Sequence, residues 1–578
     1  MPDTGSMNNA PRPEASNAPP GKIVRESPKQ FMIAERRLAA RMPGMGLPPA
    51  VIDLVEQNLR ASPDIDLVER IGPKGLTGAL ADGMAGVPHV LVARMAEDQA
   101  EFLRQQARGL LIVERDQPLY LEGAVLEQPS LVRGLAPPGT PSLEITVMVL
   151  GKDNAPLKDA EVFLYGSVSM ASACTDDRGL VTLALRGETA NSIRSLYVSP
   201  RADYWTFHQA QPALDANQPN IVFLHPLSDS FAGFPRQQTL GWGQKAMRLD
   251  QLPAQYRGKG VRIALIDTGA AASHTDLQGV RFGFDVTNSR HDPTTWNQDP
   301  VSHGSHCAGI IAGGADTSTG IRGFAPDAEI HVCKVFPGGQ ASQLIEAIEY
   351  CIEKQIDLIN LSVATNEVSE ALEQQLLRAK RLGIACIASA GSSGGRVQYP
   401  ASSPNVLAVS AIGKLGEFPA DSYHSREPVA VDGMGFFSPR FTCFGPEVGV
   451  CGPGVAILSA VPPNNYAIWD GTSLAAAHVT GLAALVLAHH PDFQGPFKAR
   501  NAMRVDRLFQ ILKISAQPLN LGDPRRTGFG LPDVLVALGI APPLNAPSMF
   551  STMGVVNAFG SQATLGPGAF APSPIAVW

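Results

Sequence analysis

The sequence predicts an α/β protein in which a mostly parallel sheet, covered by helices on both faces, occupies residues 235–541. In this region continuous apolar runs of strand length alternate with amphipathic helical runs, which is typical of strands buried on both faces. Before it the pattern changes twice, and a chain of 578 residues is too long for one ordinary core. We therefore expect two smaller domains ahead of the sheet: a ferredoxin-like α+β domain at 28–130 and a small β-sandwich at 140–226.

Composition narrows the functional classes. A hydrophobic content of 44% with 17% charged residues indicates a globular protein with a large interior. The net charge of −7 is modest for this length, so it gives no reason to expect nucleic acid or a membrane surface as a partner. The first twenty residues contain no apolar core like that of a secretory signal, and seven cysteines, an odd number, favour free thiols. We expect a cytoplasmic protein, with export by an unconventional route as the alternative.

The first domain is predicted from alternating strand and helix patterns. After residues 1–27, which are rich in Pro, Ala and Asn and expected to be disordered, the order is β-α-β-β-α-β. The strands are expected at "QFMIAERR", "IDLVERIG", "HVLVARM" and "LLIVERDQPLYL", and the helices at "PPAVIDLVEQNLRAS" and "AEDQAEFLRQQAR". This order predicts the ferredoxin-like fold, which by itself indicates no function.

The second domain and the C-terminal tail carry no recognisable chemistry. Residues 140–226 show short strands with turn signals, "LEITVMVL", "AEVFLYG", "LVTLALR", "SLYVS" and "IVFLH", which predict a small antiparallel β-sandwich. Residues 542–578 contain no charged side chain and are expected to be disordered or loosely wrapped on their own domain. The apolar side chains of this tail leave a docking role as the less favoured alternative.

The large domain is where functional groups are expected. Its strands are predicted at "VRIALI", "EIHVCKVF", "IDLINLSV", "IACIAS" and "VLAVSAI", and its helices at "SQLIEAIEYCIEKQ" and "EALEQQLLRAKRLG". The second helix is closed by Gly383, as a C-cap would close it. In open parallel sheets functional groups gather at the carboxyl ends of the strands, so residues at these ends are the candidates.

Asp267 ends the first of these strands in the sequence Asp-Thr-Gly. A structural Asx turn is one interpretation. An aspartic-protease motif is a second, but that chemistry needs two carboxylates sharing a proton, and no second apolar strand ends in the same way. The third is that Asp267 orients a histidine.

The candidate histidine is His303, in "DPVSHGSHCAGIIAGG", whose small residues allow close packing against a sheet. A metal site formed by His303, His306 and Cys307 is less favoured, because the spacing is not that of a zinc hydrolase and no fourth ligand follows. We expect His306 and His478 to be hydrogen-bonded packing residues.

A hydroxyl then opens a long apolar helix in "WDGTSLAAAHVTGLAALVLAHHP". Ser473 could be a helix cap. It could also be a nucleophile, because a serine activated by a neutral imidazole, itself held by a carboxylate, matches the order Asp267, His303, Ser473. Each motif is weak alone, but the three together in an α/β context are specific.

These residues lie within blocks that resemble the subtilisin-like serine peptidases over about residues 240–540. The blocks are "ALIDTGAAASHTDL", "SHGSHCAGIIAG", "YPASSPNVLAVSAI", "FGPEVGVCGPG" and "GTSLAAAHVTGLAAL". The resemblance implies that Asp267 is the orienting acid, His303 the general acid/base and Ser473 the nucleophile of an acyl-enzyme mechanism on protein or peptide substrates. The N-terminal unit is similar to the family's inhibitory propeptide, which implies an intramolecular inhibitor and activation by autoproteolysis or by displacement of this unit.

The resemblance also implies an oxyanion-stabilising position and substrate contacts. Ser392 stands where the family has an Asn that donates to the oxyanion, and loss of such a donor in a subtilisin costs on the order of 10²–10³ in kcat. The implied substrate-binding residues are Gly338, Ser362, Ala364, Gly391 and Gln398. No cofactor is implied as required; calcium is often found in the family, but no ligand cluster maps onto this sequence.

Three other departures shape the expectations. Ala477 replaces the usual Pro of the nucleophile helix and should perturb it little. Ala364 and Gln398 stand where glycine is common, which predicts a restricted P1 pocket favouring small or particular side chains. The β-sandwich separates the propeptide-like domain from the peptidase, so a cut in "LEGAVLEQPSLVRG" would retain it and one in "HPLSDSFAGFPRQQ" would remove it. The alternatives to a general endopeptidase are a catalytically weakened binding protein and a narrow-specificity processing protease.

Overall fold

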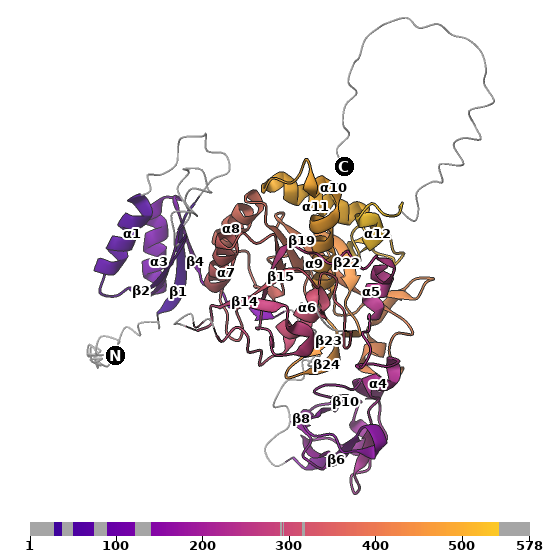
Figure 1. Cartoon of the computed structure of the whole chain (residues 1–578). Helices are drawn as coiled ribbons and strands as arrows, with labels where there is room; N and C mark the ends of the chain where they lie inside the picture. The colour runs from indigo at the N-terminus through magenta and orange to yellow at the C-terminus, as the bar shows by residue number, and fades with distance from the viewer. Residues whose placement is uncertain are drawn as a thin grey trace, which may run out of the picture.

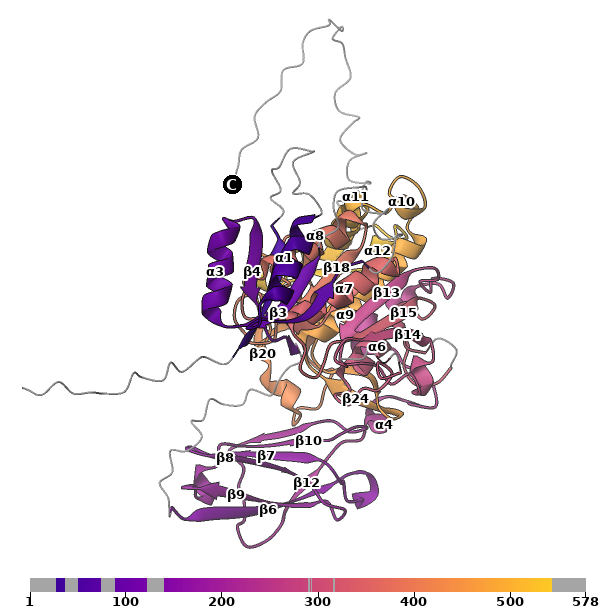
Figure 2. The same ribbon diagram turned by 90° about the vertical axis from the view of Figure 1, so that its left-hand side faces the viewer.

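The computed structural model describes residues 28–36, 50–73, 89–121, 140–288, 292, 294–314 and 318–542. Three parts follow one another along the chain: an N-terminal unit, a β unit of two sheets, and a large α/β unit (Figure 1). The N-terminal unit lies beside α7 (Ala341–Glu353) and α8 (Glu370–Arg381), and the β unit lies on another side of the large unit (Figure 2). The expected disordered segment 1–27, and the expected tail apart from residue 542, lie outside the described residues.

The large unit is built on a nine-stranded sheet of order β14-β15-β13-β16-β18-β19-β21-β20, with β22 also paired to β19. Strands β13 to β16, β18, β19 and β22 pair in parallel, whereas β20 and β21 are antiparallel additions. The predicted α/β sheet is thereby confirmed. The strands span Arg262–Asp267 (β13), Val280–Asp285 (β14), Glu329–Lys334 (β15), Leu358–Leu361 (β16), Ala385–Ser389 (β18), Val406–Lys414 (β19), Pro428–Val431 (β20), Phe436–Pro439 (β21) and Val448–Pro453 (β22).

Helices cover both faces of this sheet because its central strands are apolar over most of their length. In β13, Ile263 and Leu265 belong to the core that contains α6 (His303–Ala312) and α9 (Thr472–His489). The alternate residues Ala264 and Ile266 belong to the core that contains α7 and α8. A strand places successive side chains on opposite faces, so one apolar run supplies two cores.

The long helix α9 is the centre of the large unit. By length and composition it could cross a membrane, but 89% of its 18-residue window is buried inside the protein, as in a core helix. The remaining elements of this unit are α4 (Leu227–Ser230), α5 (Trp242–Ala246), α10 (Pro491–Gln494), α11 (Ala502–Ile514), α12 (Val534–Ala537), β17 (Val363–Ala364), β23 (Ile457–Val461), β24 (Asn465–Trp469), β25 (Ala516–Gln517) and β26 (Leu531–Pro532).

The N-terminal unit has a four-stranded antiparallel sheet of order β2-β3-β1-β4, and its described residues also form the helices α1 and α3. Its elements are β1 (Lys29–Glu35), α1 (Ala50–Ala61), β2 (Asp66–Ile71), β3 (Val90–Met95), α3 (Glu97–Ala107) and β4 (Leu111–Arg115). One sequence expectation is wrong: "LLIVERDQPLYL" is not a single strand. Strand β4 ends at Arg115, and a separate strand β5 (Tyr120–Leu121) pairs with β17 of the large unit. Pro118 lies between them and has no N–H to donate to a continuing strand.

The β unit packs two sheets, β11-β10-β7-β8 and β12-β6-β9, around one apolar core. The expectation of a purely antiparallel unit is wrong at one edge, because β12 pairs in parallel with β6. Trp205, inside the range assigned to this unit, is 2% exposed and belongs to the core of the large unit. The strands span Ser142–Leu150 (β6), Glu161–Tyr165 (β7), Met170–Cys174 (β8), Leu180–Arg186 (β9), Ser195–Ser199 (β10), Phe207–Ala210 (β11) and Asn220–Phe223 (β12).

Candidate active site

Asp267, His303 and Ser473 meet at the carboxyl edge of the sheet. Asp267 is the last residue of β13, His303 the first of α6, and Ser473 the second of α9. His303 Nδ1 lies 2.7 Å from Asp267 Oδ1, and His303 Nε2 lies 2.8 Å from Ser473 Oγ. Residues 36 and 170 positions apart therefore form one continuous hydrogen-bonded chain.

Glycines allow this approach. A Cβ on Gly304 would lie 2.0 Å from the carbonyl oxygen of Gly269, so α6 can begin directly over the turn that follows Asp267 only with glycine there. Gly269 itself has a φ of +114°, a conformation that glycine adopts without a steric cost.

The electrostatics of the three residues favour a basic imidazole. Burial alone lowers the pKa of His303, but the charge of Asp267 and its hydrogen bond, with a smaller contribution from Cys307, raise this pKa well above 6.5. Asp267 is fully buried and His303 is 5% exposed, so solvent screens their interaction little. In this arrangement Nδ1–H donates to Asp267, which leaves Nε2 to accept a proton from Ser473.

Ser392 lies next to Thr472, the residue before Ser473, and is hydrogen-bonded to it. Its Oγ is 3.0 Å from Thr472 Oγ1, and the backbone N–H of Thr472 donates to the same Oγ at 3.4 Å. Thr472 Oγ1 also accepts from the backbone N–H of Gly391. Thr472 was not among the residues singled out from the sequence, and its hydroxyl is part of the polar group beside Ser473.

The expected substrate-binding residues gather around the same edge. Ser362 is fully buried, and its Oγ lies 4.0 Å from Cys307 Sγ, which is 3.9 Å from His303 Nδ1. Ala364 lies in β17 and pairs with Tyr120. Gly338 has a φ of +82°, and a Cβ there would meet no atom within 4 Å.

Gln398 packs directly against Gly391. A Cβ on Gly391 would lie 2.3 Å from Gln398 Oε1 and 2.9 Å from Cys443 Sγ, so the Gln398 carboxamide and the Cys443 thiol close over this glycine. The backbone N–H of Gln398 donates to the carbonyl of Ala390, which fixes the side chain at this place. The structure thus places the long polar side chain of Gln398 against a residue of the expected P1 pocket.

Two other histidines, His306 and His478, lie in α6 and α9, the helices that carry His303 and Ser473. His306 and His478 are fully buried, and burial lowers their pKa values to about 3 and about 4. His306 stacks on Trp469 and donates to the carbonyl of Ala467; His478 donates to the carbonyl of Leu474. Both are hydrogen-bonded packing residues in this structure.

One buried pair was missed by sequence reasoning. His424 Nδ1 lies 2.7 Å from Asp470 Oδ1, and the same oxygen accepts from the backbone N–H of Ala456. Asp470 lies three residues before Ser473, and the His424 ring meets Trp205 edge-on at 5.8 Å. No local motif signals this pair, because His424 and Asp470 come from different loops.

In the described part of the chain, Asp267, His303 and Cys307 are the residues whose ligand atoms could surround a metal, lying within 4.8 Å of one another. Calcium prefers a cage of oxygen atoms, and this nitrogen- and sulfur-containing group does not fit it. His303 Nδ1 is moreover already hydrogen-bonded to Asp267, so these atoms are better described as part of the Asp-His-Ser arrangement.

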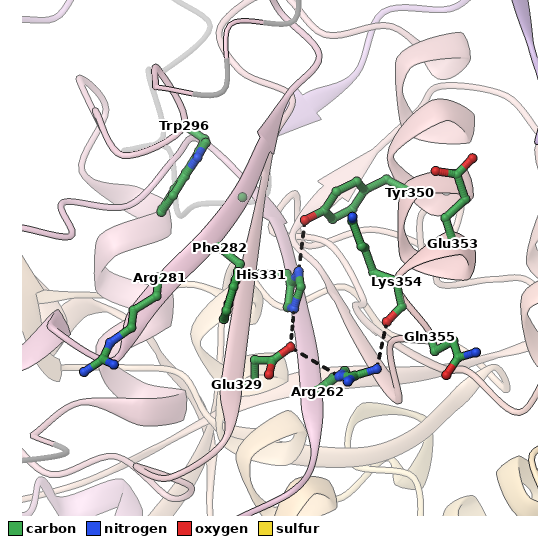
Figure 3. A pocket seen from close by; sticks show the side chains of 11 residues that line it. Arg262, Arg281, Phe282, Trp296, Glu329, His331, Tyr350, Glu353, Lys354 and Gln355 are labelled. Carbon is green, nitrogen blue, oxygen red and sulfur yellow. Dashed lines mark hydrogen bonds and ion pairs between the residues drawn. The ribbon is translucent and has the colours of Figure 1, made fainter. Parts of the chain in front are cut away.

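A cavity of about 610 Å³ lies at the opposite edge of the sheet. Arg262 and Glu329, at the amino ends of β13 and β15, line it together with Phe282, His331 and Tyr350 (Figure 3). His331 bridges Glu329 and Tyr350, and Arg262 pairs with Glu329, so these four side chains are occupied with one another. Asp267 ends the same strand at its other end, so the cavity is not part of the active site.

Comparisons with known proteins show the family to which the chain belongs. Residues 258–530 match the model of the subtilase family. Subtilisin DY of Bacillus licheniformis is 33% identical over 309 residues, which cover 52% of this chain and 99% of that relative. The subtilisin of Bacillus pumilus is 34% identical over 280 residues, covering 47% of this chain and 90% of that relative. Subtilisin NAT of Bacillus subtilis subsp. natto is 35% identical over 280 residues, 47% of this chain and 65% of that relative. The chain belongs to the subtilase family and is a serine-type endopeptidase.

Proposed function

We propose that Asp267, His303 and Ser473 are the catalytic triad of this endopeptidase. The observation that carries the proposal is the hydrogen-bonded chain from Asp267 through both ring nitrogens of His303 to Ser473 Oγ. Ser473 Oγ attacks the substrate carbonyl carbon while its proton passes to His303 Nε2. The peptide C–N bond then breaks, the leaving amine takes that proton, and the acyl group remains as an ester on Ser473.

Water completes the cycle by the reverse proton movements. It attacks the ester carbonyl, gives a proton to His303, and the proton returns to Ser473 Oγ as the C–O bond breaks. The negative charge that develops on the carbonyl oxygen is met by the N–H groups in the first turn of α9 and by the adjoining hydroxyls of Ser392 and Thr472. A serine hydroxyl is a shorter donor than an asparagine amide, so this stabilisation is weaker than an asparagine at position 392 would give.

The N-terminal unit is proposed to inhibit the enzyme by occupying its substrate cleft. Glu114 accepts hydrogen bonds from Ser369 Oγ and from the backbone N–H groups of Glu370 and Ala371, at the start of α8. Asp116 likewise accepts from the backbone N–H and the hydroxyl of Ser342, in the first turn of α7. Two carboxylates at two helix N-termini form a favourable electrostatic contact.

The segment that follows these carboxylates pairs with β17, which contains Ala364, one of the expected substrate-binding residues. Leu119 N–H donates to the carbonyl of Gly339 at 2.8 Å, and β5 pairs with β17. An extended segment held between two others by main-chain hydrogen bonds is the way a peptide substrate would be held. Activation would therefore require cleavage after this segment and dissociation of the unit.

The β unit is proposed to remain with the mature enzyme. Trp205 lies in the core of the large unit, and Asp203 exchanges hydrogen bonds with Tyr466 through N–H and Oδ1. Removing the chain up to "HPLSDSFAGFPRQQ" would expose this apolar contact, so a cut between residues 121 and 140 is favoured.

We further propose a reducing, cytoplasmic setting, because all seven cysteines are free.

A narrow-specificity processing protease is the second candidate, favoured by the packing of Gln398 on Gly391.

Both candidates share one test. Wild-type protein and Ser473→Ala are expressed in parallel, and their N-termini and hydrolysis of casein and of quenched peptides are measured. We expect a shortened, active wild type and an intact, inactive variant. Equal processing of both chains, or equal hydrolysis by both, would contradict the proposed triad.

A further inference from the structure

We infer that the β unit supports catalysis by holding the segment that carries the nucleophile, and that His424 is the positioning residue through which it does so. The inference rests on the proposed triad and extends it to the turn Tyr423–Arg426, which lies between β19 and β20. This turn contacts the β unit on one side and the chain just before Ser473 on the other. These two sets of contacts connect the β unit to the active site.

The β unit holds the turn by main-chain and aromatic contacts. The N–H of Tyr423 donates to Thr206 Oγ1 at 3.3 Å. The N–H of His208, in β11, donates to the carbonyl of Asp421 at 2.7 Å. The Tyr423 ring meets the ring of Tyr197 edge-on at 4.9 Å, and Tyr197 lies in β10, on the side of the β unit that faces the large unit (Figures 1 and 2). The position of the turn therefore depends on the β unit.

His424 joins this turn to the nucleophile segment. Its Nδ1 lies 2.7 Å from Asp470 Oδ1, a carboxylate oxygen that accepts the Nδ1–H, and only 3% and 5% of the two side chains are exposed. The other ring nitrogen of His424, Nε2, is buried and has no hydrogen-bond partner within the described ranges. A buried nitrogen without a partner destabilises a folded chain, so packing alone would favour an apolar side chain at this position. The bond from Nδ1 to Asp470 is therefore what a histidine contributes here.

Asp470 fixes the chain that leads into Ser473. Its Oδ1 also accepts from the N–H of Ala456 at 2.7 Å. The N–H of the next residue, Gly471, donates to the carbonyl of Gly454 at 2.8 Å. Two anchored residues thus set where the first turn of α9 begins, and with it the direction of Ser473 Oγ. Reacting groups must be held closely, since a displacement of about 1 Å can lower a rate by about 10²-fold.

The path from the β unit should affect catalysis more than substrate binding. None of the expected substrate-binding residues belongs to the turn or to the segment from Asp470 to Ser473, so loss of the His424 contact should lower kcat and leave KM nearly unchanged. The junction also contains an exposed pair, His225 and Asp421, whose side chains are 56% and 45% accessible to solvent. Solvent screens such a pair, so it contributes little and provides a control at the same junction.

Two isosteric substitutions separate the hydrogen bond from the packing of the ring. His424→Asn and His424→Leu both lose the edge-on contact with Trp205, but the asparagine amide can donate to Asp470 and the leucine side chain cannot. A fluorophosphonate titrates the active sites of each purified protein, and kcat and KM are measured with a quenched peptide that contains a casein bond cut by the wild type. We expect kcat in His424→Leu to be about tenfold or more below that in His424→Asn, with similar KM. The rate of fluorophosphonate labelling of Ser473 should fall in parallel. His225→Leu should keep kcat within about twofold of the wild type.

A double-mutant cycle tests whether the β unit acts through His424. Tyr423→Ala removes the edge-on contact with Tyr197 and should lower kcat in the wild type. In the His424→Leu background it should lower kcat no further, because residues in one network do not contribute independently. Tyr423→Phe, which keeps the ring, is the matched control and should retain the kcat of the wild type.

Two results would overturn the inference: equal kcat per active site in His424→Leu and His424→Asn, or independent, multiplying effects of Tyr423→Ala and His424→Leu. If His424→Leu does not fold, Tyr423→Ala and Tyr423→Phe carry the test, and equal kcat values in these two variants would overturn it. Failure of the proposed function looks different, because Ser473 of the wild type would then not be labelled. An unlabelled wild type overturns both the triad and this inference, whereas a labelled wild type with equal variants overturns this inference alone.

Discussion

Replacing Glu114 by alanine should weaken the hold of the N-terminal unit on the enzyme. Glu114 accepts three hydrogen bonds at the start of α8, at 2.5, 3.0 and 3.1 Å. A hydrogen bond to a charged group contributes about 1.5–3 kcal/mol, and a carboxylate at a helix N-terminus adds about 0.3–1 kcal/mol. Burial offsets part of this, since it raises the pKa of Glu114 and so disfavours the charged form. We expect a net loss of about 2–4 kcal/mol, or an increase in Kd of about 30- to 1000-fold.

The assay measures peptide hydrolysis while the noncovalent complex of the processed enzyme with its N-terminal unit is diluted. As the complex is diluted below its Kd, the N-terminal unit dissociates and peptide hydrolysis appears, so the midpoint concentration reports the affinity. Glu101→Ala is the matched control: it removes a glutamate that pairs with Arg104 on the solvent side of α3. The reasoning is refuted if Glu114→Ala shifts the midpoint no more than Glu101→Ala does.

Three further predictions concern catalysis and stability. Asp267→Asn should lower kcat by about 10⁴-fold. The imidazole of His303 must be neutral to act as the base, and Asp267 raises its pKa. The kcat/KM of the wild type should therefore fall as the pH drops through a value above 6.5, and in Asp267→Asn this acidic fall should occur at lower pH. An acidic fall at the same pH in both proteins would contradict the assignment. Ser392→Asn should raise kcat with little change in KM. The increase should not exceed the factor of about 10²–10³ that such a donor supplies in a subtilisin. An unchanged kcat would show that Ser392 already stabilises the oxyanion as well as an asparagine would. Trp205→Ala should lower the free energy of unfolding of the large unit by about 3–5 kcal/mol in urea titrations, whereas a change confined to the β unit would disprove the shared core.

The sequence predicted the central sheet because its signal is local. The run of apolar residues ending at Asp267 can be buried only on both faces, and the structure uses alternate residues of β13 in two cores. The positions of Asp267, His303 and Ser473 in their motifs indicated one site for the same reason: each sits at the end of a strand or the start of a helix. Their meeting depends on strand order, which no local pattern contains.

What the sequence could not show depends on contacts between distant segments. The run around Pro118 predicts one strand by composition, yet the segment after it leaves its own sheet to pair with β17. Trp205 belongs by position to the β unit and by packing to the large unit. The contact of Gln398 with Gly391, and the pair of His424 with Asp470, join loops whose approach is set only by the complete fold.

The central claim is that Ser473 is the nucleophile activated by His303. The most direct measurement is to treat the processed enzyme with a fluorophosphonate at neutral pH and locate the adduct by mass spectrometry of its peptides. We predict one adduct, on Ser473, formed in wild type and lost in His303→Ala. An adduct on another serine, or none on processed wild-type protein, would contradict the account.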